Sequence, residues 1–189
     1  MEAFLVSAGI VALAEIGDKT QLLSLLLAAR YRKPWPIIAG IFIATLANHF
    51  LAGAVGAWLT AVIGRDAMRW ILGASFIAMA VWIMIPDEID ETQTGDRGGS
   101  VLVATVIAFF LAEMGDKTQV ATVALAAQYP SLVGVVMGTT VGMMIANVPA
   151  VLVGDKAATR LPLKLVHGVC AALFAGLGTL ALLNVGNTF

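Results

Sequence analysis

The sequence predicts an all-α integral membrane protein of six transmembrane helices, arranged as two inverted three-helix repeats. Three observations lead to this prediction: an apolar composition, a succession of long apolar segments, and a six-residue motif that occurs twice. Of the 189 residues, 60% are hydrophobic and only 12% are charged, whereas about 25% of residues are charged in soluble domains. Helices and closed barrels are the structures that span lipid, and these segments lack the alternation typical of strands.

Six apolar segments approach or exceed the length of about 20 residues that a helix needs to cross a bilayer. Loops rich in charge, proline or glycine separate them. These are a basic loop at 30–36, a short turn at 64–66, an acidic linker at 87–100, a Tyr-Pro-Ser break at 129–131 and a basic loop at 155–164. We expect helices at about 4–29, 37–63, 68–85, 101–128, 132–153 and 165–185.

The second half of the chain repeats the first. The motif Glu-Ile-Gly-Asp-Lys-Thr at 15–20 returns as Glu-Met-Gly-Asp-Lys-Thr at 113–118, each time preceded by Ala and followed by Gln. Chance similarity between apolar segments does not predict a shared octet, so we infer a duplication of 1–86 in 101–189, joined by the linker at 87–100. A shift of 98 residues also aligns Ser7 with Thr105, Ser24 with Thr122, Gly40 with Gly138 and His49 with Asn147.

Three helices per repeat is an odd number, so the second repeat must enter the membrane from the opposite side. Positive residues mark cytoplasmic loops, which places both termini in the periplasm and the acidic linker in the cytoplasm. Inverted repeats of this kind hold the substrate site near the midplane of the bilayer. The positive residues of the cytoplasmic loops are Arg30, Arg32, Lys33, Arg97, Lys156, Arg160 and Lys164, against Arg65 and Arg69 on the other side.

Several other classes of protein do not fit the composition. A formal net charge of -1 gives no reason to expect a nucleic-acid partner. Cys170 is the only cysteine, so neither a disulfide framework nor a cysteine metal cluster is expected, and two histidines are too few for a histidine-based metal site. No basic segment precedes the first apolar run, so a cleaved signal peptide is not expected.

The two motifs place ionisable residues at the centre of apolar segments, where each costs roughly 2.5–3.5 kcal/mol on insertion scales. Residues three apart share a helix face, so we expect Glu15 and Asp18 to point together, as do Glu113 and Asp116. Four convergent carboxylates at the repeat axis would be oxygen ligands, which suit Ca²⁺, Mg²⁺ and Mn²⁺. The sequence therefore predicts a divalent-cation site, with the cation as cargo and no cofactor.

The other polar residues at depth are expected to support this site. Lys19 and Lys117 would each neutralise one carboxylate, leaving two negative charges for one divalent cation. The glycine inside each motif costs about 1 kcal/mol in a helix, so a local unwinding there would expose carbonyl oxygens. Neutral oxygens would come from Thr20, Gln21, Thr118 and Gln119, and the deep polar residues of the second and fifth helices are Asn48, His49 and Asn147. Asparagines in such helices more often join helices than bind ions, and for His49 a role as ligand stays open.

Clustered carboxylates in a low-dielectric site hold protons when no metal is bound. Metal entry would release those protons, and protons arriving from the acidic side would release the metal. If metal and protons compete for one site that opens alternately to the two sides of the membrane, the result is proton-coupled antiport.

The duplicated Glu-x-Gly-Asp-Lys-Thr motif, on the first helix of each three-helix repeat, resembles the Gdt family of cation/proton exchangers over essentially the whole chain. The resemblance implies transport of manganese or calcium against protons, and the short bacterial members resemble manganese exporters. It implies metal-site roles for Glu15, Asp18, Glu113 and Asp116. The compact length points to a bacterial inner membrane, so the lipid bilayer, protons and Mn²⁺ or Ca²⁺ are the expected partners.

Other functions compete with manganese export. A calcium/proton antiporter would use the same fold. A passive cation channel would be distinguished by a cation flux that does not depend on the proton gradient. In a purely structural reading, the motif acids and lysines form an ion-pair network without cargo. An intramembrane aspartyl protease also needs paired acids at depth, but its Gly-x-Gly-Asp motif has glycine where Glu15 and Glu113 stand. We therefore expect no enzymatic activity.

Overall fold

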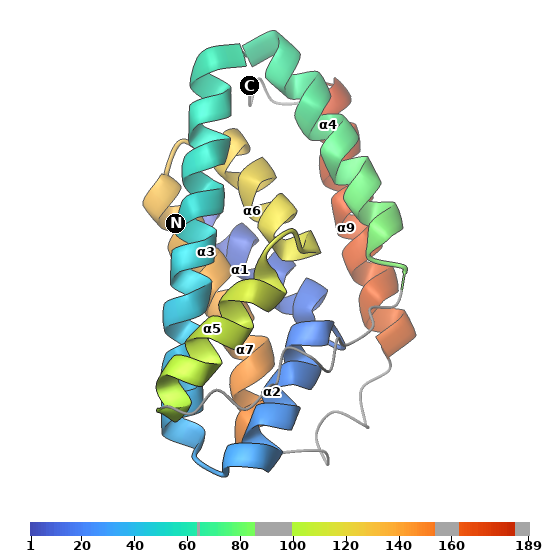
Figure 1. The fold of residues 1–189 in the computed structure, drawn as a ribbon. Coiled ribbons are helices and arrows are strands. Elements are labelled where there is room, and N and C mark those ends of the chain that lie inside the picture. Colours follow the sequence, from blue (N-terminus) through green and yellow to red (C-terminus); the bar gives the residue numbers. More distant parts are fainter. Residues whose placement is uncertain (64, 86–99, 154–162, 184–189) are drawn as a thin grey trace.

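A computed structural model describes residues 1–63, 65–85, 100–153 and 163–183 (Figure 1). All secondary structure within these residues is helical, as the sequence predicts. The helices are α1 (Glu2–Glu15), α2 (Lys19–Tyr31), α3 (Pro34–Ile63), α4 (Arg65–Trp82), α5 (Val101–Glu113), α6 (Lys117–Gln128), α7 (Leu132–Val153) and α9 (Leu163–Leu183).

Four predicted helices are present within a few residues of their expected ends. The helix expected at 132–153 has those bounds as α7, and the helices expected at 37–63, 68–85 and 165–185 correspond to α3, α4 and α9. α3 begins earlier than predicted, at Pro34, because proline is tolerated in the first turn of a helix. Most of the acidic linker at 87–100 and most of the basic loop at 155–164 lie outside the described residues.

The continuous helices expected at 4–29 and 101–128 are wrong. Each is interrupted at its motif, so that α1 ends at Glu15 and α2 begins at Lys19, and α5 ends at Glu113 and α6 begins at Lys117. The glycine of each motif has a positive φ, 82° at Gly17 and 76° at Gly115. A right-handed helix cannot continue through a left-handed residue, so the local unwinding that the sequence allowed becomes a complete break.

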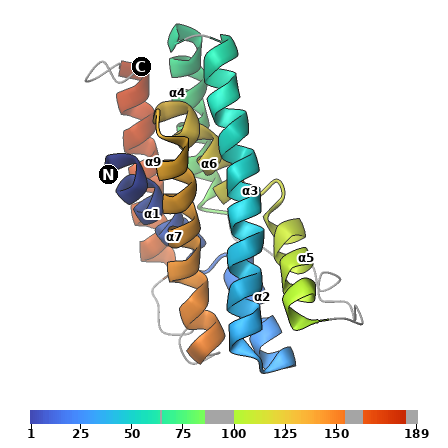
Figure 2. The ribbon, with the colours of Figure 1, turned by 90° about the vertical axis from the view of Figure 1, so that its left-hand side faces the viewer.

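Each broken helix packs against the other half of the chain. α1 lies along α7, and its counterpart α5 lies along α3, while α2 contacts α7 and α6 contacts α3. In both views α6 lies toward the upper end of the long helix α3, α2 and α5 lie toward its lower end, and α1 lies above α2 beside the middle of α3 (Figures 1 and 2). The two breaks are therefore brought near the middle of the molecule.

Small residues allow these helices to approach closely. A Cβ added to Gly40 in α3 would lie 2.7 Å from Thr105 Cβ in α5, and one added to Gly138 in α7 would lie 2.5 Å from the Phe4 carbonyl oxygen in α1. Gly40 and Gly138 are positions that the 98-residue shift aligns. The two helix crossings thus use the same glycine of the repeat, as expected for close packing of apolar helices.

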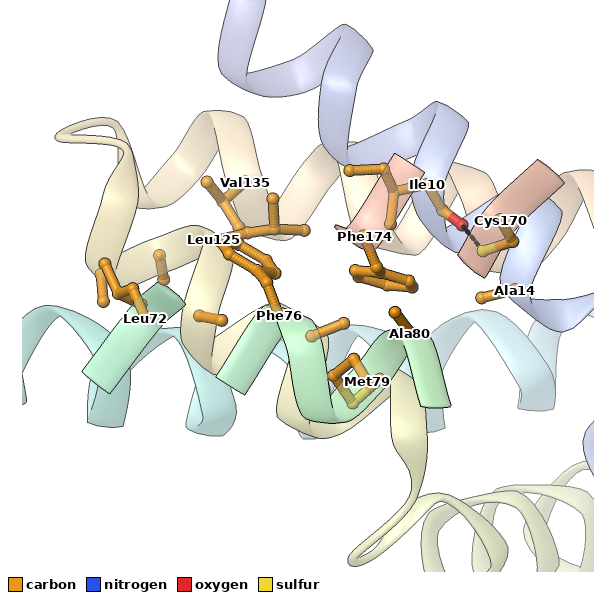
Figure 3. Close-up of a cluster of buried hydrophobic side chains, with 14 of the residues drawn as sticks. Ile10, Ala14, Leu72, Phe76, Met79, Ala80, Leu125, Val135, Cys170 and Phe174 are labelled. Carbon is orange, nitrogen blue, oxygen red and sulfur yellow. Dashed lines mark hydrogen bonds between the residues drawn. The ribbon is translucent and has the colours of Figure 1, made fainter. Parts of the chain in front are cut away.

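α4 and α9 form a pair that packs on α1 and α6 through an apolar cluster (Figure 3). The rings of Phe76 in α4 and Phe174 in α9 stack with centroids 6.1 Å apart. Ile10 of α1, Leu125 of α6 and Val135 of α7 complete the buried surface around them. This cluster holds α4 and α9 beside the motif helices α1 and α6.

Buried carboxylates and exposed apolar side chains occur together in this molecule. Glu15 is fully buried and Glu113 is 1% exposed, whereas Trp58 on α3 is 61% exposed. Buried acids are rare in soluble proteins, and when they lie within an apolar chain they are typical of functional sites in membrane proteins. Among the described residues, Pro34–Ile63 and Leu132–Leu152 are long and apolar enough to cross a membrane.

Candidate metal site

The two helix breaks have nearly the same backbone conformation. The residue before each glycine is extended, with φ and ψ of -67° and 114° at Ile16 and -63° and 121° at Met114. The aspartate after each glycine is also extended, at -78° and 166° for Asp18 and -80° and 166° for Asp116. Each aspartate precedes the next helix but does not cap it with its side chain. The shared motif therefore specifies one local structure, made twice.

A glutamine side chain closes each break. The Gly17 N–H donates to Gln21 Oε1 at 2.9 Å, and the Gly115 N–H donates to Gln119 Oε1 at 2.7 Å. These amide groups have lost their helical partners, and an unpaired N–H within an apolar protein is costly. From the sequence we expected both glutamines to offer neutral oxygens to a cation. In the structure those side-chain oxygens instead accept hydrogen bonds from the glycine N–H groups.

Three of the four predicted acids lie together. Glu15, Glu113 and Asp116 each place one carboxylate oxygen within 4.8 Å of the others, and all three are at most 2% exposed. The Thr20 hydroxyl donates to Glu15 and the Thr118 hydroxyl donates to Glu113. Each threonine thus orients the glutamate of its own motif, so that both glutamates keep one oxygen without a hydrogen bond, Oε1 of Glu15 and Oε2 of Glu113.

Asp18 is not part of this set of three, although it is buried. Its Oδ1 lies 3.7 Å from Lys117 Nζ. The expectation that Glu15 and Asp18 share one helix face is wrong, because residues 16–18 are not helical. Glu15 instead ends one helix and Asp18 precedes the next, and the acids approach one another across the two halves of the chain.

The lysines pair with the aspartates of the opposite motif. Lys19 Nζ lies 2.8 Å from Asp116 Oδ1, and Lys117, beside Asp18, also donates to the Ile85 carbonyl oxygen at 3.1 Å. We call these two contacts, Lys19–Asp116 and Lys117–Asp18, the crossed ion pairs. They compensate both aspartates, so the formal charge that remains is that of Glu15 and Glu113. Two glutamates match one divalent cation, because a buried charge without a partner is strongly unfavourable.

The helix ends around the glutamates also favour a cation. Glu15 is the last residue of α1 and Glu113 is the last residue of α5. The C-terminus of a helix carries a partial negative charge from carbonyl groups that lack helical partners. In ion-coupled transporters with broken helices, such ends contribute to cation sites.

The deep asparagines join helices. Asn48 Nδ2 donates to the Phe110 carbonyl oxygen at 3.0 Å, which ties α3 to α5. Asn147 Oδ1 accepts the Ser24 hydroxyl at 2.6 Å, which ties α7 to α2. His49 is different, because its Nε2 lies 3.6 Å from Glu113 Oε1, beside the carboxylate set.

Sequence reasoning missed one residue at the first break. His167 in α9 places its Nε2 2.9 Å from the Ile16 carbonyl oxygen. No local pattern points to this contact, because it depends on how α9 packs against α1. The corresponding carbonyl at the second break belongs to Met114, whose side chain is 56% exposed.

Buried carboxylates beside broken helices of an apolar chain are typical of membrane proteins that carry cations. The sequence model of one family, described as "Divalent cation/proton antiporter GDT1", matches residues 3–91 and again residues 101–188. The chain belongs to the GDT1 family of divalent cation/proton antiporters. The family resemblance inferred from the duplicated motif is thereby confirmed.

Relatives cover nearly the whole chain. A protein of Vibrio cholerae named "Putative manganese exporter" is 54% identical over 92% of this chain and 87% of its own length. A GDT1-like protein of Synechocystis is 29% identical over 93% of this chain and 95% of its own length. GDT1-like protein 4 of Oryza sativa is 26% identical over 93% of this chain and 71% of its own length. No solved structure matches the chain significantly.

The positive φ at Gly115 leads to a test of the break itself. A Cβ added there would have no atom within 4 Å, so substitution tests the backbone conformation alone. Gly115→Ala should lower the free energy of unfolding by about 1–2 kcal/mol, the cost of a left-handed L-residue. Gly115→Asn should cost less, because asparagine adopts this region more readily. Thermal unfolding in detergent measures both, and an alanine variant as stable as the wild type would contradict the assignment.

Proposed function

We propose that this protein is a secondary transporter that exports Mn²⁺ from the cytoplasm in exchange for protons. One observation carries the proposal: the crossed ion pairs compensate both aspartates and leave Glu15 and Glu113, buried and facing each other, with the charge of one divalent cation. The description of the family supports exchange of a divalent cation for protons. The name of the Vibrio cholerae relative supports manganese as the cargo.

The architecture that we propose is six membrane spans in two inverted three-helix repeats, 1–86 and 101–189, with a cytoplasmic linker at 87–100. In this arrangement α1 and α2 form one broken span, and α5 and α6 form another. α1 and α2 have 14 and 13 residues, which at 1.5 Å per residue extend about 40 Å, more than the roughly 30 Å of a bilayer core. In both views α1 lies above α2 whereas α5 lies below α6, and this opposite order supports the inversion (Figures 1 and 2).

We further propose that the protein lies in a bacterial inner membrane with both termini in the periplasm. Three exposed basic residues, Arg30 in the last turn of α2 and Arg32 and Lys33 between α2 and α3, support a cytoplasmic position for that turn. A reporter enzyme fused after Phe189 should be active in the periplasm, and one inserted near Gly95 should be active in the cytoplasm. Activity of both fusions on the same side would contradict the inverted repeats.

In the proposed site, Glu15, Glu113 and Asp116 bind the cation, and Asp18, beside Lys117 in this structure, is the fourth ligand. The lysines act as internal counter-ions for the aspartates while the site holds no cation. The other predicted residues hold the site in shape. Thr20 and Thr118 orient the glutamates, Gln21 and Gln119 close the breaks, and Asn48 and Asn147 join the helices.

Proton coupling follows from the burial of the two glutamates. Without a cation they are two like charges in an apolar interior, a state that protonation relieves. A divalent cation that enters must displace these protons, and protons that enter from an acidic periplasm displace the cation. The same carboxylates therefore serve both substrates in turn, which is the requirement for antiport.

The first test of this site removes single carboxylates. Asp116→Asn and Asp18→Asn should each lower the initial rate of Mn²⁺ transport into proteoliposomes at least about tenfold, since even residues that only orient a metal ligand contribute roughly 10–100-fold. Glu2→Gln is the matched control, because Glu2 is an exposed acid at the start of α1. Helical content and gel-filtration elution should stay unchanged in all three variants. Full transport by either aspartate variant would remove the shared-site proposal.

The second test concerns coupling. An imposed pH gradient should drive Mn²⁺ toward the more acidic compartment, because protons leaving that compartment exchange for metal entering it. An ionophore that collapses the gradient should slow the metal flux, and internal pH should rise as Mn²⁺ enters. Cells without this protein should accumulate manganese and become sensitive to it. Metal flux that ignores the gradient would indicate a channel instead.

Calcium/proton exchange is the second candidate, because carboxylate oxygens also suit Ca²⁺. The assay with Ca²⁺ in place of Mn²⁺ decides between the two, and a response to calcium alone would keep the mechanism but change the cargo. A protease mechanism has less support from the geometry. Each aspartate lies beside a lysine, whereas an aspartyl protease needs two aspartates that share a proton.

A further inference from the structure

His49 is a fully buried side chain beside the proposed cation site. It lies near the middle of α3 with no exposed surface, and its Nε2 is 3.6 Å from Glu113 Oε1. Neither ring nitrogen has a hydrogen-bond partner in the described part of the chain. A buried polar atom without a partner costs about 1–3 kcal/mol. A ligand bound by the ring nitrogen would relieve this cost.

The equivalent position in the second repeat is Asn147, which has its partners. Asn147 accepts the Ser24 hydroxyl at 2.6 Å and donates to the Met143 carbonyl oxygen at 3.1 Å. The repeat aligns Ser24 with Thr122, but the Thr122 hydroxyl donates to the Thr118 carbonyl oxygen at 2.8 Å. The hydroxyl that would hold His49 in place is thus bonded within its own helix. At this position the second repeat has Asn147, whose amide is fully hydrogen-bonded. The first repeat has His49, whose imidazole nitrogen lies beside Glu113 and could bind a metal.

The chemistry of this donor set distinguishes classes of divalent cation. Ca²⁺ and Mg²⁺ take oxygen ligands almost entirely. Imidazole nitrogen favours first-row transition metals, whose affinity rises from Mn²⁺ through Fe²⁺ and Co²⁺. Three carboxylates alone would bind either class, so a single nitrogen ligand would change the preference of the site.

We infer that His49 is a nitrogen ligand of the transported cation and makes the site prefer transition-metal dications to Ca²⁺ and Mg²⁺. This inference rests on the proposed function, because it concerns the same site. His49 approaches the cation from α3, on the side of Glu113, and the glutamates and Asp116 supply the oxygens. Co²⁺ and Fe²⁺ should then compete with Mn²⁺ more strongly than Ca²⁺ does.

Pulsed electron paramagnetic resonance of bound Mn²⁺ tests the ligand directly. Purified protein without a histidine tag, loaded with Mn²⁺ in detergent, should show ¹⁴N coupling from a directly bound imidazole. Labelling with ¹⁵N-histidine should replace that coupling by the ¹⁵N signal. His49→Gln should lose it, and His167→Gln should keep it; these are the only two histidines of the chain. Bound Mn²⁺ without histidine coupling in the wild type would overturn the inference, even if His49→Gln did not fold.

Transport selectivity gives the second readout. His49→Gln should lower the preference for Mn²⁺ over Ca²⁺ by at least about tenfold, judged by initial rates in proteoliposomes, while proton exchange continues. Glu2→Gln, at an exposed acid outside the site, should leave the preference unchanged. An unchanged preference in His49→Gln would overturn the inference and leave the proposed antiport intact. If the wild-type protein showed no proton-coupled Mn²⁺ flux in proteoliposomes, the proposed function itself would be wrong, whatever the spectra show.

Discussion

The energetic cost of a buried, unpaired charge governs the arrangement of both motifs. Carboxylates and ammonium groups within an apolar protein cost several kcal/mol each unless they are paired, and this chain places six of them near its centre. Two of the four acids are compensated by lysines from the opposite half. The two glutamates that remain are oriented by threonines and lie close to Asp116. An incomplete balance of charge is thus built into the fold, and the proposed cargo is what completes it.

The helix breaks make this arrangement possible. A continuous helix would place Glu15 and Asp18 one turn apart on a single face. Its backbone carbonyl groups would all accept hydrogen bonds within the helix. The positive φ of Gly17 turns the chain, so that a helix ends at the glutamate and a new one begins after the aspartate. Gln21 supplies the hydrogen bond that the break removes. Glycine and glutamine therefore form the structural part of the motif, and the charged residues form its chemical part.

Much of this could be predicted from the sequence. Six apolar segments and a duplicated motif were enough to predict the all-helical fold, the family and the acids to examine. The complete breaks were not predictable, because a glycine costs only about 1 kcal/mol in a helix, too little to decide its end. The contact between His167 and the Ile16 carbonyl oxygen and the separation of Asp18 from the other acids depend on tertiary packing. No pattern within one segment contains that information.

The crossed ion pairs also bear on how the two halves of such a protein can evolve. Lys19 has its counter-ion in the second half, and Lys117 has its counter-ion in the first. A substitution at either lysine is therefore compensated only by a change in the other half. The crossed ion pairs therefore couple these four positions across the two halves of the chain. Residues 49 and 147, histidine in one half and asparagine in the other, are an aligned position beside the site at which the two halves differ chemically.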